Sequence, residues 1–149
     1  MQTYQHILLA TDFSEHSEQT ARRACDLAKL HGAELSILHV VEYLPIGDAA
    51  YGPIYPFDID LTEQMLETAR ERMAKIAEDL HIAEPRRFVE VGSPKAEIIR
   101  MAETLEVDLI VVGTHGRHGI SLLLGSTAAS VIHHAGCDVL VVRLRHAAK

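Results

Sequence analysis

One stretch of this 149-residue sequence concentrates glycines and hydroxyl residues. Gly113, Gly116 and Gly119 are spaced through its first part, and Gly125-Ser126-Thr127 follows where a helix is expected to begin. Glycines let backbone N–H groups approach an anion closely, and a helix start adds unpaired N–H groups and the positive end of the dipole. Arg117 supplies a charged fork that suits a phosphate. The stretch predicts an anion site, although spaced glycines before a helix also occur as ordinary turns.

Short apolar runs and longer helical stretches alternate around this segment. Strands are expected at residues 4–11, 33–42, 86–91, 107–112 and 138–144, with helices at 17–31, 62–80, 94–105 and 125–136. Ser14 or Ser17 is expected to cap the first helix, and Gly32 to end it. The alternation predicts one α/β domain over residues 1–149, with an open, doubly wound parallel sheet and right-handed crossovers.

In such a sheet, ligands bind beyond the carboxyl ends of the strands, where the strand order reverses. The residues that follow the expected strands are Asp12, Val40–Glu42, Gly92-Ser93 and Gly113 onward. The irregular segment 43–60 leaves the second strand on the same side and holds three of the four tyrosines. It is therefore expected to form a flap beside the ligand.

The composition excludes several classes of function. The net charge of −7 argues against binding to nucleic acid or to anionic membranes. No apolar run approaches the roughly 18 residues of a membrane span, and the first residues do not resemble a signal peptide, so a cytoplasmic protein is expected. Cys25 and Cys137 form no zinc or redox motif. The ten histidines lack the partners that a catalytic or metal site needs, so neither is expected.

Several ordered motifs together resemble the universal stress protein family across essentially the whole chain. They are ILLATDFSEHS from residue 7, LSILHVVE from residue 35, VGSPKAEII from residue 91, DLIVVGTHGRHG from residue 108 and GSTAASVIHHAGCDVLVVR from residue 125. The resemblance implies a five-stranded sheet of order 3-2-1-4-5 with helices on both faces, of the adenine-nucleotide alpha-hydrolase-like type. It also implies a homodimer in the stress response, with protein partners that the sequence does not identify.

The resemblance further implies an adenine nucleotide (ATP, ADP or AMP) as a regulatory ligand. Asp12 resembles the acidic residue near the ribose and adenine, and Val41 or Val40 the residue whose backbone meets the adenine edge. The full set of implied nucleotide-binding residues is Ala10, Thr11, Asp12, Val40, Val41, Gly113, Thr114, Gly116, Arg117, Gly125, Ser126 and Thr127. Simpler roles exist for some of them. Helix capping could be the sole role of Asp12, Ser126 and Thr127, and the two valines are strand residues in any case.

The glycine spacing departs from the nucleotide-binding pattern of the family, which resembles Gly-x2-Gly-x9-Gly-(Ser/Thr). Here eight residues, 117–124, separate Gly116 from Gly125, and that is the spacing of the branch without nucleotide. The alternative function is therefore a nucleotide-free dimer that acts through protein contacts alone. A slow ATPase is a third hypothesis, but the sequence shows no Mg²⁺-binding carboxylate pair and no water-positioning base. A binding protein is favoured over an enzyme.

The last expected strand has an apolar sequence and lies at a sheet edge. An exposed apolar edge is a template for pairing, and two copies related by a two-fold axis would cover it. The charged tail 145–149 could instead block the edge. The expected dimer residues are Val139, Leu140, Val141, Val142, Arg143 and Leu144.

Overall fold

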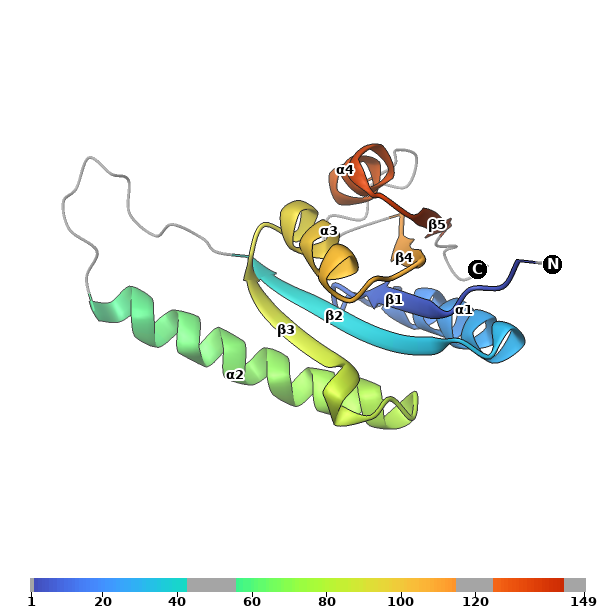
Figure 1. Ribbon diagram of the computed structural model, residues 1–149. Helices are drawn as coiled ribbons and strands as arrows, with labels where there is room; N and C mark the ends of the chain where they lie inside the picture. Colours follow the sequence, from blue (N-terminus) through green and yellow to red (C-terminus); the bar gives the residue numbers. More distant parts are fainter. Residues whose placement is uncertain (1, 43–55, 115–124, 144–149) are drawn as a thin grey trace, which may run out of the picture.

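The computed structural model describes residues 2–42, 56–114 and 125–143 of the chain. Within them, the strands form a five-stranded parallel sheet of order β3-β2-β1-β4-β5 (Figure 1). The expected strand order is thereby confirmed. The elements are β1 (His6–Ala10), α1 (Ser17–His31), β2 (Glu34–Glu42), α2 (Pro56–Asp79), the short 3₁₀ helix η2 (Glu84–Arg86), β3 (Arg87–Gly92), α3 (Pro94–Thr104), β4 (Leu109–Gly113), α4 (Ser126–His134) and β5 (Asp138–Val142).

Helices cover both faces of the sheet, with α1 and α2 on one face and α3 and α4 on the other (Figure 1). Alternate residues of the central strands supply the two cores. Ile7 and Leu9 of β1 pack under α1 and α2, whereas Leu8 packs under α3 and α4. All three side chains are fully buried. Burial on both faces explains why the central strands are mostly apolar.

Local sequence signals placed most element boundaries. The first helix begins at Ser17 and ends at His31 as expected, and Gly32 takes the left-handed backbone, with φ of 63°. Each strand lies within its expected range or extends one residue past it. Among the described helices, none combines the length and the apolar composition that a membrane span requires.

Three boundary predictions were wrong. The second helix begins at Pro56 rather than at residue 62, because proline suits the first helical position and needs no backbone hydrogen bond there. Residues 56–60 are therefore helical, and the rest of the expected flap, 43–55, lies outside the described residues. The residue that precedes α1 at its N-cap is His16, so neither Ser14 nor Ser17 caps it. The last helix covers only Ser126–His134, because ψ is 150° at Gly125 and 140° at Ala135, and neither value is helical.

Candidate functional site

The strand order reverses beside β1, which pairs with β2 on one side and with β4 on the other. Leu9 of β1 lies opposite Val111 of β4, and both strands end shortly afterwards, at Ala10 and Gly113. The segments that follow, 11–16 and the one that begins at Thr114, therefore leave the sheet side by side. This is the position where open parallel sheets bind ligands.

The end of β4 is joined directly to the start of α4. The backbone N–H of Thr114 donates to the carbonyl of Val142 over 3.1 Å, and the N–H of Gly125 donates to the carbonyl of Thr114 over 2.9 Å. The ten residues between them are outside the described part of the chain, and these include the expected site residues Gly116 and Arg117. The Thr114–Gly125 bond brings the positive end of the α4 dipole to the carboxyl edge of the sheet.

Gly125 is the N-cap of α4, and no side chain of the described residues caps this helix. Ser126 and Thr127 stand in its first turn, so the simpler interpretation that they cap the helix is wrong. Amide groups of a first helical turn have no acceptor within the helix. Ser126 is exposed and Thr127 is half-buried, so both hydroxyls lie where α4 meets the end of β4. This arrangement suits a negatively charged group.

Asp12 lies in the segment between β1 and α1. Its carboxylate oxygen Oδ1 accepts a hydrogen bond from the N–H of Ser14 over 2.9 Å, and Thr11 Oγ1 accepts one from the N–H of Phe13 over 3.2 Å. Because α1 begins at Ser17 after His16, Asp12 does not cap that helix, and this simpler interpretation is also wrong. Asp12 is half-buried. Within the described ranges, Oδ1 is the Asp12 oxygen that accepts a hydrogen bond.

Val40 and Val41 lie on β2 past the end of β1. The paired register of β1 and β2 ends at Ala10 and Leu38, where the N–H of Thr11 donates to the carbonyl of Leu38. Both valine side chains are buried, Val40 under α3 and α4. Because the β1–β2 register ends at Leu38, the backbone of these two valines borders the position beside β1 where the strand order reverses.

His39 is part of the site that the sequence did not reveal. It is buried, its Nδ1–H donates to the carbonyl of Thr11 over 2.8 Å, and its ring stacks on Phe13 with centroids 3.9 Å apart. The guanidinium of Arg72 lies 5.9 Å from the centroid of Phe13. A histidine in the middle of a mostly apolar strand was the available signal, since a buried polar group needs a partner.

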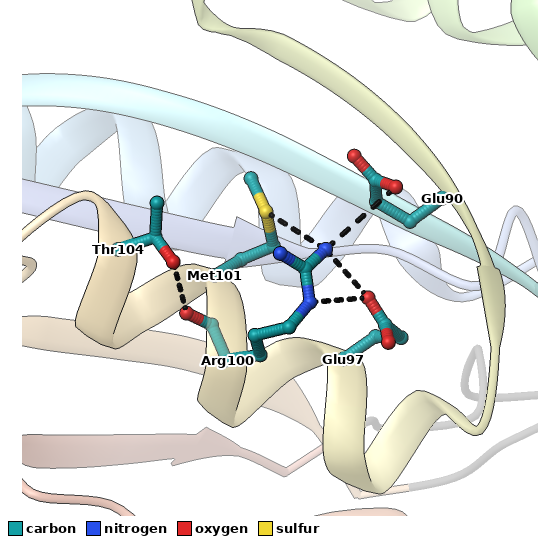
Figure 2. A network of polar contacts seen from close by, with 5 residues as sticks. All are labelled: Glu90, Glu97, Arg100, Met101 and Thr104. Atoms are coloured by element: carbon teal, nitrogen blue, oxygen red, sulfur yellow. Dashed lines mark hydrogen bonds and ion pairs between the residues drawn. The ribbon is translucent and has the colours of Figure 1, made fainter.

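The end of β3, also nominated by the sequence, is built differently. Gly92 has φ of 151°, and a Cβ there would lie 3.1 Å from Cγ of Glu97. Figure 2 shows that Arg100 holds this carboxylate, because its Nε and one terminal nitrogen donate to Glu97 Oε2 over 2.9 and 2.7 Å. The same nitrogen lies 3.7 Å from a Glu90 oxygen. Since β3 is separated from β1 by β2, Gly92 and Ser93 belong to the sheet edge and not to the reversal.

Neither the cysteines nor the metal-binding residue types form a second candidate site in the described residues. Burial raises the pKa of both Cys25 and Cys137, which keeps these free thiols protonated and poorly nucleophilic near neutral pH. In the described ranges, no three His, Cys, Asp or Glu side chains gather as a metal site would require.

Comparison with known proteins identifies the relatives of this chain. Residues 3–143 match the model of the universal stress protein family. Universal stress protein A homolog 2 of Coxiella burnetii is 42% identical over 97% of this chain and 99% of its own length. The solved structure of the universal stress protein UspA from Lactobacillus plantarum has a TM-score of 0.81 at 28% identity, over 96% of this chain and all of that one. A universal stress protein solved in complex with cAMP has a TM-score of 0.60 at 26% identity, over 95% and 98% of the two chains.

Proposed function

This chain belongs to the universal stress protein family, and from that membership we propose that it is a stress-response protein regulated by a bound adenine nucleotide. The nucleotide lies at the carboxyl ends of β1 and β4. ATP, ADP or AMP acts as a ligand that sets the state of the protein, and any hydrolysis of ATP is slow. The proposal includes a cytoplasmic location and a single domain over residues 1–149.

The observation that carries the proposal is the hydrogen bond from Gly125 N–H to the Thr114 carbonyl, 2.9 Å long. It brings the start of a nine-residue helix to the strand end where the sheet order reverses. The Asp12 carboxylate follows the neighbouring strand. An anion-binding element and a hydroxyl-binding carboxylate on adjacent strand ends match the two halves of a nucleotide.

Each half of the ligand has its residues. The phosphates meet the first turn of α4 at Ser126 and Thr127, next to the end of β4 at Gly113 and Thr114. The ribose hydroxyls donate to Asp12, and the adenine edge pairs with the backbone of Val40 or Val41. Ala10 and Thr11 lie between the phosphate half and the adenosine half of the ligand. The sequence predicts that Gly116 and Arg117 complete the phosphate contacts. The solved relative that holds cAMP supports a nucleotide as the class of ligand.

We also propose that two copies pair through β5. The sheet has two edge strands, β3 and β5. Charged side chains occupy β3, where Glu90 faces Arg100 and Arg87 donates to the Ile82 carbonyl. The run Val139–Val142 on β5 carries no charge and is only half-buried. Charges protect an edge strand from pairing, so β5 is the better template for a second copy, with Arg143 extending the contact. The expected dimer residue Leu144 lies outside the described residues.

A second candidate function follows from the glycine spacing. Eight residues separate Gly116 from Gly125, one fewer than in the nucleotide-binding pattern that the sequence resembles. A shorter segment would move the phosphate donors of the first glycines relative to α4. The second candidate is a dimer of the same fold that binds no nucleotide and acts through protein contacts alone.

Analysis of the purified protein separates the two candidates. Denaturation of protein that was never exposed to added nucleotide is expected to release an adenine nucleotide, identified by chromatography and absorbance. If protein from nucleotide-rich lysate releases none, and none is retained after incubation with ATP and gel filtration, the second candidate is correct. Light scattering on the same sample tests the dimer, and a monomer mass at micromolar concentration would contradict pairing through β5.

A further inference from the structure

His39 contacts both chain neighbours of Asp12. Its Nδ1–H donates to the carbonyl of Thr11, and its ring stacks on Phe13 at an interplanar angle of 26°. We propose that His39 is a positioning residue, which holds Asp12 in place for the adenosine half of the ligand. This inference rests on the proposed nucleotide function and deepens it, because it assigns ligand specificity to a residue that does not touch the ligand.

The burial of His39 shows that its hydrogen bond matters. The residue is 6% exposed and lies on β2 between Leu38 and Val40, both of which pack under α3 and α4. Alternation along the strand turns His39 to the other face, under α1 and α2. An apolar residue would be the ordinary choice at such a position. A histidine there can instead satisfy the carbonyl of Thr11, which has already left the β1–β2 ladder.

The backbone of Phe13 shows that the segment is held against its own preference. Phe13 has φ of 60°, a conformation that is uncommon for bulky residues. Such conformations persist when the surroundings fix them, and they concentrate at ligand sites. The surroundings here are the His39 ring on one side, the Arg72 guanidinium 5.9 Å from the ring centroid, and the Thr11 hydroxyl that accepts from the Phe13 N–H. Asp12 stands between the two residues that are fixed in this way.

The contacts of His39 with Thr11 and Phe13 lie in the β1–α1 half of the site. The phosphate half is built by Thr114, Gly125 and the first turn of α4, on the far side of β1. A change at His39 should therefore weaken ligands that contain adenosine and leave the binding of a bare phosphate chain unchanged. A general loss of folding would weaken both to the same extent.

Titration calorimetry with ATP and with inorganic tripolyphosphate tests this division in the full chain. His39→Leu is expected to weaken ATP about tenfold, the equivalent of one hydrogen bond, and to leave tripolyphosphate within about twofold. His39→Asn is expected to recover most of the ATP affinity, because the asparagine amide can donate from nearly the position of Nδ1. Ile37→Val is the matched control, since Ile37 lies two residues earlier on the same strand and in the same core. It should change neither affinity.

Several results would overturn the inference. Equal weakening of both ligands by His39→Leu would assign His39 to folding alone, and unchanged ATP affinity would remove its role altogether. Equal loss in His39→Asn and His39→Leu would also contradict the hydrogen bond as the cause. If His39→Leu does not fold, Phe13→Leu removes the stack and should give the same division in smaller measure. Failure of the wild-type protein to bind ATP would instead refute the proposed function, and this inference with it.

Discussion

The two ends of the sheet use their polar groups in opposite ways. At the amino ends of the strands, the Asp108 carboxylate accepts hydrogen bonds from the N–H groups of Gln5 and His6, over 2.8 and 3.0 Å. The Tyr4 hydroxyl donates to Asp138 over 2.9 Å. These bonds tie the starts of β1, β4 and β5 together. Side chains at this end therefore complete the fold.

At the carboxyl ends of the strands, similar polar groups are positioned by the fold, but part of their hydrogen-bonding capacity is not used by the described residues. In the part of the chain that the structure describes, only one oxygen of Asp12 accepts a hydrogen bond, and no side chain caps α4. Phe13 has a strained backbone, and in the described residues the buried Ser14 hydroxyl has no hydrogen-bond partner. Both of these features lower the stability of the fold. In the proposed function, the amino end of the sheet secures the fold and the carboxyl end binds the ligand.

The largest effect is expected from Asp108→Ala. It leaves the N–H groups of Gln5 and His6 without their charged acceptor, and each such bond contributes about 1.5–3 kcal/mol. With partial solvent access, the free energy of unfolding should fall by about 3 kcal/mol, measured by urea denaturation. Asp108→Asn, which keeps one acceptor oxygen, should lose about half as much. ATP affinity of the folded variant should stay at the wild-type value, and a loss of affinity would break the division between the two ends.

Asp12→Ala is expected to give the opposite pattern. Loss of the carboxylate should weaken ATP about tenfold, or roughly 1.5 kcal/mol, and leave tripolyphosphate unchanged. The fold should lose only about 1 kcal/mol, through the contact with the Ser14 N–H. In the control Asp12→Asn, the amide oxygen preserves that contact, so any change in ATP affinity arises from the lost charge. An ATP affinity unaffected by either substitution would contradict the assignment of Asp12.

Some of these features could be predicted from the sequence, and others could not. The boundaries of α1 and the left-handed Gly32 depend on neighbouring residues, so local patterns sufficed. The position of Asp12 at a strand end followed from the same patterns. The contact between His39 and Phe13 joins β2 to the segment between β1 and α1, and the Asp108 contacts span about a hundred residues, so no local signal could reveal them. The start of α2 was missed because the tyrosines and prolines before it resemble a loop.

Ser126→Ala should have a smaller effect, confined to the phosphate half. Removal of one hydroxyl donor is expected to weaken ATP about fivefold, or roughly 1 kcal/mol, and tripolyphosphate by the same factor. Adenosine should bind as before. The melting temperature should not change, because Gly125 and not Ser126 is the N-cap of α4. A fall in melting temperature without a change in ATP affinity would show that Ser126 serves the helix rather than a ligand.

The smallest effect concerns pH at the amino end. The hydrogen bond to Asp138 raises the pKa of Tyr4 above its ordinary value of 10.0. The folded state therefore holds this proton more tightly than the unfolded state, and the stabilisation is complete below pH 10 and is lost as the pH rises through the folded pKa. Denaturation midpoints from pH 9 to about pH 11.5 should fall slightly more steeply for the wild type than for Tyr4→Phe. Parallel profiles would show that this bond contributes nothing.

Amide spectra of the isotope-labelled wild-type protein, recorded by nuclear magnetic resonance during titration with ATP, test the central claim most directly. The account predicts saturable shifts for Asp12, Val41, Thr114 and Ser126 at the carboxyl end of the sheet. The amides of Gln5, His6 and Leu109 at the amino end should keep their positions. An absence of shifts at millimolar ATP, or shifts centred on the amino end, would contradict a nucleotide site at the carboxyl ends of β1 and β4, where the strand order reverses.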